Sequence, residues 1–312
     1  MPKALYLLAV VAIGLILSFG VFLNHDAEAA PAGSWNTDFA EAQRQARDED
    51  KDLLLNFTGS DWCGFCIELE DAVFTRKAFV DLARNEFVLV EVDFPAKKPQ
   101  SDAVKQQNAE LKQRYGVAGY PTVLLIDSEG NPYAQTGYLE GGPDEYLEHL
   151  GELRQNKGKR DDALAAAESA TGSEKASHLD EAMAAVGMDL AVTYYLDTVR
   201  EIVQLDASDQ SGLKSKYQTA IRNTEINRGV QMAIAALQAQ QVEQGMAQLD
   251  QILRMDSLSS QQIQMINGIR GQVLQQLGRI EEARAAYQAA LQADPQSPVA
   301  PQILQLIQQL EQ

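Results

Sequence analysis

The sequence predicts an α/β domain, in which helices flank a mixed sheet, followed by an all-α domain of helical hairpins. Between residues 34 and 157, short apolar runs alternate with amphipathic, helix-forming stretches, a pattern typical of a sheet covered by helices. From residue 161 onward no strand-like run occurs, and the composition shifts to alanine, glutamine and leucine. With 312 residues, the chain is long enough for these two domains.

The elements of the first domain follow from its apolar runs and their breaks. The short apolar run within residues 52–57, which lies between the charged residues Asp52 and Asp61, is typical of a buried strand over residues 52–57. Apolar residues at helical spacing after Cys63 predict a helix over residues 63–84. The other expected elements are helix 36–50, strand 87–94, helix 101–115, strand 122–127, turn 128–131, strand 133–138 and helix 143–156.

Cys63 and Cys66 are the only cysteines of the chain, and two residues separate them. This spacing places both thiols within one helical turn, so a small disulfide ring can form and open there. Zinc normally requires four nitrogen or sulfur ligands, and the available histidines are too few: His25, His149 and His178. A purely structural disulfide is an alternative, although so short a loop stabilises a fold little. The pattern favours a redox-active dithiol without a metal.

The dithiol is expected at a strand-to-helix junction, which bears on its chemistry. The N–H groups and dipole at a helix N-terminus favour a thiolate, so Cys63 is the expected exposed nucleophile and the more buried Cys66 the resolving thiol. Acidic residues nearby oppose the thiolate: Asp61, Glu68, Glu70 and Asp71. No Lys, Arg or His lies between Lys51 and Arg76. We therefore expect a modestly lowered Cys63 pKa and a rather reducing couple, which favours a reductase.

A second motif, Gly119-Tyr120-Pro121-Thr122, leads into a later strand-like run. A proline directly before a strand cannot donate a ladder hydrogen bond and belongs at a strand start or a bend. Together with Trp62-Cys63-Gly64-Phe65-Cys66, this motif resembles the thioredoxin family, over roughly residues 34–157. The resemblance implies the thioredoxin fold and the activity of an exported thiol–disulfide oxidoreductase, with no cofactor.

The resemblance also implies roles for single residues. Cys63 and Cys66 would be catalytic, Pro121 would be a cis proline facing the dithiol, and the backbone of Tyr120 would pair with the substrate. The expected substrate-binding residues are Trp62, Gly64, Phe65, Tyr120 and Pro121. The family's buried aspartate near the dithiol is matched by Asn56, which cannot titrate. Water or a nearby carboxylate would have to move the proton of the resolving thiol instead.

Residues 1–30 differ from the rest of the sequence. Lys3 precedes an uncharged apolar run over residues 4–23, and the small-residue site Ala27-Glu28-Ala29 follows. This pattern is typical of a secretory signal peptide cleaved after Ala29. The run is also about long enough to span a bilayer, so an uncleaved N-terminal membrane anchor is the alternative. Both interpretations place the remaining chain in the periplasm or another extracytoplasmic compartment.

Export has two consequences for the dithiol. A chain whose only thiols are the active pair cannot form wrong disulfides with itself in an oxidising compartment. A reductase in that compartment also needs electrons delivered across the membrane. The sequence therefore implies two kinds of partner, client proteins that carry disulfides or thiols and a membrane electron donor.

The charge of the chain excludes further classes of partner. Its formal net charge is −18, spread over both halves, which argues against nucleic acid and anionic membrane surfaces. No glycine-rich phosphate loop, paired-carboxylate signature or Ser-His-Asp order appears in the sequence.

The second domain shows weak internal repetition. Residues 278–295 resemble the second half of a tetratricopeptide repeat. The small, aromatic and proline positions of that repeat are matched by Gly271, Ala283, Tyr287, Ala290 and Pro295. Residues 242–256 align with 280–294, and 199–206 resemble another repeat end. We expect about three helical hairpins and a capping helix over 298–311, or a plain helical bundle as the alternative. Such hairpins usually present a concave surface to a protein partner.

The predicted organisation is a signal peptide or anchor over residues 1–30, a thioredoxin-like domain over 31–158 and a helical domain over 159–312. The predicted function is disulfide reduction or exchange in client proteins, with the helical domain binding partners. A non-enzymatic scaffold, in which the helical repeats carry the function, is the competing hypothesis. An oxidase or an isomerase of the same fold would differ only in redox potential.

Overall fold

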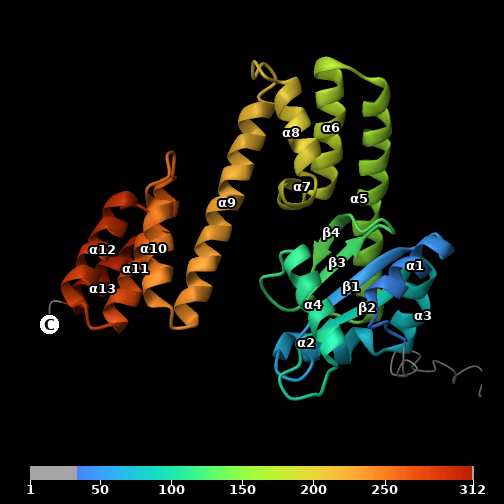
Figure 1. Ribbon diagram of the computed structural model, residues 1–312, viewed down its shortest axis with the longest axis horizontal. Helices are drawn as coiled ribbons and strands as arrows, with labels where there is room; N and C mark the ends of the chain where they lie inside the picture. The colour runs from blue at the N-terminus through green and yellow to red at the C-terminus, as the bar shows by residue number, and fades with distance from the viewer. Residues whose placement is uncertain (1–33, 311–312) are drawn as a thin grey trace, which may run out of the picture. The chain divides into compact units, whose positions relative to one another are not determined.

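The computed structural model describes residues 34–310, and its helices and strands are labelled in Figure 1. Contacts divide the chain into two compact units, with the division between Lys214 and Ser215. The first unit contains a four-stranded sheet and helices α1 to α8. The second unit contains helices α10 to α13 and nearly all of α9.

The sheet is mixed, with the strand order β2-β1-β3-β4. Its strands are β1 (Asp52–Thr58), β2 (Phe87–Asp93), β3 (Thr122–Ile126) and β4 (Pro132–Thr136). β1 runs parallel to β2 and antiparallel to β3, and β3 forms an antiparallel hairpin with β4. Every residue of β1 is buried, as a central strand covered on both faces requires. The sheet and its flanking helices confirm the predicted thioredoxin fold.

Helices cover both faces of the sheet. On one face, α1 (Phe39–Glu49) and α4 (Asp102–Arg114) pack on an apolar core shared by β1, β2 and β3. On the other face, a cluster of aromatic rings joins α3 (Lys77–Glu86) to α5 (Pro143–Ser169). The alternation of side chains along each strand supplies apolar groups to both layers.

The helix expected over residues 63–84 is not continuous. It begins as α2 (Gly64–Leu69), passes through a short π-helical segment, η2 (Glu70–Phe74), and resumes as α3. Thr75 makes the break, because its N–H and its hydroxyl both donate to the first carbonyl of η2. The extended backbone of Arg76 then sets a new direction for α3.

Helix α5 runs past residue 156, where we expected it to end, and through position 158, where the sequence places a domain boundary. Figure 1 shows α5 leading away from the sheet into a hairpin with α6 (Gly172–Val186). The short helices α7 (Met188–Tyr194) and α8 (Leu196–Leu205) follow. The contacts group all of these helices with the sheet in the first unit.

Buried ion pairs fasten α5 to the sheet. Asp52, at the start of β1, is 1% exposed, and its carboxylate lies 2.7 Å from the Lys157 ammonium and 3.2 Å from Arg154 Nε. Arg160, which is 4% exposed, lies 3.0 Å from the buried carboxylate of Asp127. Since a buried charge left without its partner is strongly destabilising, these pairs fix the position of α5.

Two consecutive tyrosines attach α7 and α8 to the end of α4 and to β4. The hydroxyl of Tyr194 donates to the Tyr115 carbonyl at 2.5 Å, and the hydroxyl of Tyr195 donates to the Pro132 carbonyl at 2.8 Å. Tyr195 also accepts a hydrogen bond from Arg160 at 2.8 Å. Arg160 therefore contacts both Tyr195, between α7 and α8, and Asp127, which follows β3.

The second unit consists of antiparallel helices. These are α9 (Leu213–Gln238), α10 (Val242–Leu253), α11 (Ser260–Gln276), α12 (Ile280–Ala293) and α13 (Ala300–Gln309). Gly271 allows α11 to approach α12, because a Cβ there would lie 2.6 Å from the ring of Tyr287. The helical character predicted for the second half of the chain is confirmed for its described residues.

Among residues 34–310, no helix is long and apolar enough to cross a membrane. The signal peptide or anchor expected over residues 1–30 lies outside the described residues.

Candidate functional site

The two cysteines form a disulfide at the start of α2. Their sulfur atoms are bonded at 2.10 Å, and their Cα atoms lie 5.2 Å apart. Cys63 is the N-cap residue of α2, and its sulfur accepts a hydrogen bond from the Cys66 N–H at 3.3 Å. We expected an exposed Cys63, but it is only 8% exposed, against 3% for Cys66. The capping position turns its side chain toward the helix rather than outward.

The loop before the disulfide is fixed by backbone and side-chain hydrogen bonds. Ser60 donates to the Asp93 carboxylate through its N–H at 2.9 Å and its hydroxyl at 2.6 Å. Gly59 leaves space for the indole of Trp62, because a Cβ there would lie 2.6 Å from that ring. The Trp62 indole N–H donates to the Phe94 carbonyl at 2.8 Å. The tryptophan beside Cys63 is thus held in one orientation.

Asp61, one of the acidic residues close to the cysteines in the sequence, is held by backbone hydrogen bonds. Its carboxylate accepts three backbone hydrogen bonds at 2.7–2.9 Å, from the N–H groups of residues 96, 97 and 98. These hydrogen bonds lower its pKa. Asp61 therefore organises the loop after β2 at the rim of the site.

Aromatic rings flank the disulfide on its α4 side. The rings of Trp62 and Tyr120 meet edge to face with centroids 5.8 Å apart, and Tyr120 lies 5.3 Å from Phe94. The Lys112 ammonium, from α4, lies 4.8 Å from the Tyr120 ring centroid and 5.4 Å from that of Phe94. We call Trp62, Tyr120 and Phe94 the aromatic platform. Trp62, at 52% exposed, forms its open edge.

Phe65 contacts a different ring. It lies between the two cysteines in the sequence, is 61% exposed, and its ring centroid is 5.2 Å from that of Tyr138. The Tyr138 hydroxyl donates to the Glu68 carboxylate at 2.6 Å, which raises the pKa of Tyr138 to about 12. Glu68 is therefore engaged by Tyr138.

The Tyr120–Pro121 peptide bond is cis, as the family resemblance implies. The bond precedes β3, and the ring contact between Tyr120 and Trp62 brings this segment beside the disulfide. Among the described residues, the backbone N–H and carbonyl of Tyr120 have no hydrogen-bond partner. A Cβ at Gly64 would meet no atom within 4 Å, so the approach between the cysteines is open.

Glu70 and Glu91 are two partly buried carboxyls that act on each other electrostatically. Glu70 follows Cys66 by one helical turn, and its N–H donates to the Cys66 carbonyl. Burial, reinforced by the charge of Glu91, raises the pKa of Glu70 to about 7. Burial also raises the pKa of Glu91, which lies opposite Asn56 in the β1–β2 register. Asn56 is buried and cannot titrate, whereas Glu91, its partner in the β1–β2 register, can.

Sequence reasoning missed Glu91 and Lys98. The Lys98 ammonium lies 2.9 Å from the Ser60 hydroxyl. Its charge partly offsets the rise that burial causes in the pKa of Glu70 and of Glu91. We expected no cation near the dithiol because none occurs between Lys51 and Arg76. Glu91 and Asp93 are the two charged residues in the otherwise apolar strand β2. This pattern is the local sequence feature that could have indicated them.

Comparison with known proteins identifies both parts of the chain. Residues 39–154 match the family model of a thioredoxin-like domain, and residues 199–311 match that of a tetratricopeptide repeat-like domain. The chain carries a thioredoxin-like domain. The resemblance drawn from Cys-x-x-Cys and Tyr120-Pro121 is thereby confirmed.

Several relatives share the thioredoxin-like domain. The "Disulfide bond reductase DsbH" of Chlamydia pneumoniae is 39% identical over 109 residues, which are 35% of this chain and 66% of DsbH. The "Thiol:disulfide interchange protein DsbD" of Vibrio vulnificus is 31% identical over 163 residues, 45% of this chain and 25% of DsbD. The chain therefore spans just under two thirds of the first relative and a quarter of the second. A solved "DsbH Oxidoreductase" is 33% identical over 45% of this chain and 96% of its own, with a TM-score of 0.39.

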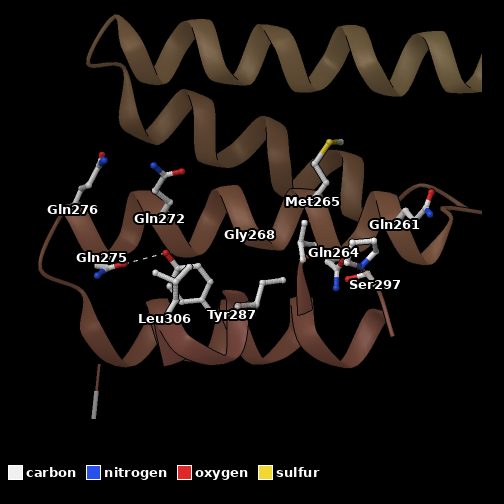
Figure 2. A pocket seen from close by; sticks show the side chains of 13 residues that line it. Gln261, Gln264, Met265, Gly268, Gln272, Gln275, Gln276, Tyr287, Ser297 and Leu306 are labelled. Atoms are coloured by element: carbon white, nitrogen blue, oxygen red, sulfur yellow. Dashed lines mark hydrogen bonds between the residues drawn. The ribbon is translucent and has the colours of Figure 1, made fainter. Parts of the chain in front are cut away.

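The second unit, within the tetratricopeptide repeat-like domain, contains a cavity of about 890 Å³. None of the residues that line it is charged, in a chain with a net charge of −18. Five glutamines of α11 line one side: Gln261, Gln264, Gln272, Gln275 and Gln276. Figure 2 shows these glutamines along the helix, with Tyr287 and Leu306 on the facing helices. A cavity of this size and character suits an uncharged, largely apolar ligand.

One polar group of this cavity has no partner. Ser297 is 9% exposed, and among the described residues its hydroxyl oxygen is buried without a hydrogen bond. Gln264, by contrast, is 4% exposed and donates to the carbonyls of Ala290 and Asp294. A Cβ at Gly268 would meet no atom within 4 Å, so the wall of α11 is open at that residue.

Proposed function

We propose that this protein is a thiol–disulfide oxidoreductase that reduces or exchanges disulfides in client proteins. The observation that carries this proposal is the Cys63–Cys66 disulfide, placed at a helix N-terminus beside the cis Tyr120–Pro121 bond and an exposed aromatic platform. The names of the relatives, a disulfide bond reductase and a thiol:disulfide interchange protein, support the same activity.

The proposed reaction begins from the reduced dithiol. The Cys63 thiolate attacks one sulfur of a client disulfide, forms a Cys63–client mixed disulfide and releases the other client sulfur as a thiol. The Cys66 thiolate then attacks the Cys63 sulfur, which restores the intramolecular disulfide and releases the second client thiol. Two electrons pass to the client, and two protons accompany them.

The proton of Cys66 needs an acceptor in this scheme, and Asn56 cannot serve. We assign this role to Glu70, because it follows Cys66 by one turn and its pKa of about 7 lets it exchange a proton near neutral pH. The carboxyl of Glu91, whose pKa is also raised, couples to that of Glu70.

Client binding is assigned to the residues around the disulfide. Trp62 and Phe65, which are adjacent to the cysteines in the sequence, offer exposed aromatic surface. The unpartnered backbone groups of Tyr120 can pair with an extended client segment. Gly64 and Pro121 complete the surface, since neither presents a side chain that obstructs a client sulfur.

We propose that electrons flow from this protein to its clients. Ionised Glu70 and Glu91 disfavour a nearby thiolate, which makes the couple more reducing. The pattern of residues 1–30 supports an exported protein, held by an anchor or released by cleavage after Ala29. In an extracytoplasmic compartment a membrane electron donor must restore the dithiol.

The helical repeats are proposed to bind a protein partner through the cavity of the second unit. Its glutamine side and apolar facing side fit an uncharged peptide segment, whose backbone the amides can bond and whose apolar side chains the cavity can bury. The unpartnered Ser297 hydroxyl supplies one further hydrogen bond for such a segment.

Trapping of mixed disulfides tests the proposed reaction. Cys66→Ser is expected to accumulate a covalent complex with a disulfide-bonded peptide, because the resolving thiol is gone, whereas Cys63→Ser forms none. Wild-type protein supplied with dithiothreitol should reduce the same peptide catalytically. A Cys66→Ser variant that traps nothing, beside an active wild type, contradicts the assigned roles.

The direction of electron flow needs a separate measurement, a redox titration against glutathione or dithiothreitol. A reductase should have a potential near that of thioredoxin, about −270 mV, and a value near about −120 mV would indicate an oxidase. If a double Cys→Ser variant retained full function in cells, the scaffold hypothesis would hold instead.

A further inference from the structure

Lys112 is a cation on the aromatic platform, and no carboxylate of the described residues neutralises it. Its ammonium lies over the rings of Tyr120 and Phe94, at 4.8 and 5.4 Å from their centroids. No carboxylate among residues 34–310 lies within 4.0 Å of it. Lys105, on the same helix, lies 3.4 Å from the Asp102 carboxylate. Helix α4 therefore presents one free charge at the aromatic platform.

The acidic groups around the aromatic platform are already engaged elsewhere. Asp61 accepts three backbone hydrogen bonds from the loop after β2, and Asp93 accepts the two hydrogen bonds of Ser60. Glu70 and Glu91 interact with Lys98. The Lys112 charge is consequently open to a carboxylate that arrives with a client.

Lys112 lies within reach of a client segment bound at Cys63. Trp62 adjoins Cys63, its ring centroid is 5.8 Å from that of Tyr120, and the Lys112 ammonium lies 4.8 Å from the Tyr120 centroid. An extended chain advances about 3.3 Å per residue. A client side chain a few residues from the attacked cysteine can therefore reach Lys112.

The surroundings of Tyr120 and of Phe65 differ in charge. The Lys112 ammonium lies over the Tyr120 ring, whereas Phe65 packs on Tyr138, whose hydroxyl donates to the Glu68 carboxylate. An acidic client residue is thus favoured over the aromatic platform and disfavoured beside Phe65.

We infer that Lys112 is a specificity residue that binds a carboxylate flanking the client cysteine. The preferred substrates are then disulfides with an acidic side chain a few residues from the attacked sulfur. This inference rests on the proposed oxidoreductase function. An exposed ion pair contributes about 0.2–1 kcal/mol, which corresponds to a preference of up to about fivefold in kcat/KM.

Peptide reduction measures this preference directly. Disulfide peptides that differ by one Glu, Gln or Lys, placed in turn at each position around the cysteine, are reduced by the full-length protein with dithiothreitol as electron source. Wild type should reduce the best-placed Glu peptide about two to five times faster, in kcat/KM, than its Gln counterpart. Lys112→Gln should abolish this difference between the Glu and Gln peptides. The matched control Lys105→Gln, on the same helix, should retain it, and so should Lys112→Arg.

Three results separate the possible failures. Equal rates on Glu, Gln and Lys peptides at every position, in an active wild type, overturn the role of Lys112. An equal loss on all peptides in Lys112→Gln also overturns it, because the lysine would then only position Tyr120. A wild type that reduces no peptide refutes the proposed function, and the inference with it.

Discussion

Glu70 changes its charge near neutral pH, and this couples the stability of the thioredoxin-like domain to pH. Burial raises its pKa from 4.5 to about 7. Between these values the folded state holds a proton that the unfolded state has released. The contribution of protonated Glu70 to the free energy of unfolding is therefore fully present below about pH 4.5 and is lost as pH rises through about 7. A pKa difference of about 2.5 corresponds to about 3 kcal/mol at most.

Glu70→Gln removes this destabilisation, because the amide stays neutral. We expect the variant to be more stable than wild type by up to about 3 kcal/mol at pH 8 and equally stable at pH 4. Urea unfolding of the oxidised protein, followed by tryptophan fluorescence, measures the difference. Both tryptophans, Trp35 and Trp62, lie in the first unit and report on it alone.

Glu110→Gln provides the control for this prediction. Glu110 is exposed on α4 and accepts a hydrogen bond from Gln106, and a surface change of this kind alters stability by less than about 0.5 kcal/mol. A Glu70→Gln variant with the same stability change at pH 4 and pH 8 would show that the carboxyl is not held protonated in the fold.

Single residues of the site were predictable where their chemistry is encoded locally. The cysteine spacing and the Tyr120-Pro121 pair indicate a thioredoxin-like site without any structure, and the cis bond agrees with that prediction. The charges around the disulfide were not predictable in this way. Asp61 is near in sequence but turned toward a loop, while Lys98 and Lys112 are distant in sequence but close in space.

Among the elements, the strands were predicted to within about one residue at most ends. Strand β1 was expected over 52–57 and covers Asp52–Thr58, because charged residues bound its apolar run. The interruption between α2 and α3 was not predicted. No Gly or Pro occurs between residues 67 and 86, and the break depends on the two hydrogen bonds that Thr75 donates to one carbonyl.

Gly268 gives an experimental test of the cavity in the second unit. A side chain at this position would enter open space rather than collide, since its Cβ has no neighbour within 4 Å. Gly268→Leu should fill part of the cavity and also stabilise α11, because leucine is favoured over glycine in a helix by about 0.8 kcal/mol. A Gly268→Leu variant that binds a ligand less tightly would therefore do so without being less stably folded.

The uncharged apolar dye Nile red serves as the probe for this cavity. Its fluorescence should rise on binding to wild type, and Gly268→Leu should weaken that binding at least about fivefold, which is a change of about 1 kcal/mol. Gln308→Leu adds the same side chain at an exposed position of α13 outside the cavity. Equal binding of the dye by both variants would show that this cavity is not its site.

At the scale of the whole molecule, the division of the chain depends on pairings that a single sequence does not reveal. The sequence predicts a domain boundary after residue 158, where the composition changes. In the structure residues 155–160 are helical, and Arg160 among them is 4% exposed and paired with Asp127. Whether a charged residue is solvated or buried with a partner is decided by distant residues, which is why the sequence alone suggested the earlier boundary.

The burial of Arg160 against Asp127 predicts that the thioredoxin-like domain loses stability when the chain is cut after residue 158. A chain of residues 34–158 retains the sheet but loses Arg160, Tyr194 and Tyr195, which leaves the buried Asp127 without its cation. Removing one partner of a buried ion pair typically costs about 3–5 kcal/mol. We therefore expect residues 34–158 to be less stable than residues 34–214 by at least about 3 kcal/mol in urea unfolding. Arg160→Met in the longer chain should reproduce most of this loss. If the two chains unfolded at the same urea concentration, the helices after α5 would contribute nothing to the stability of the sheet.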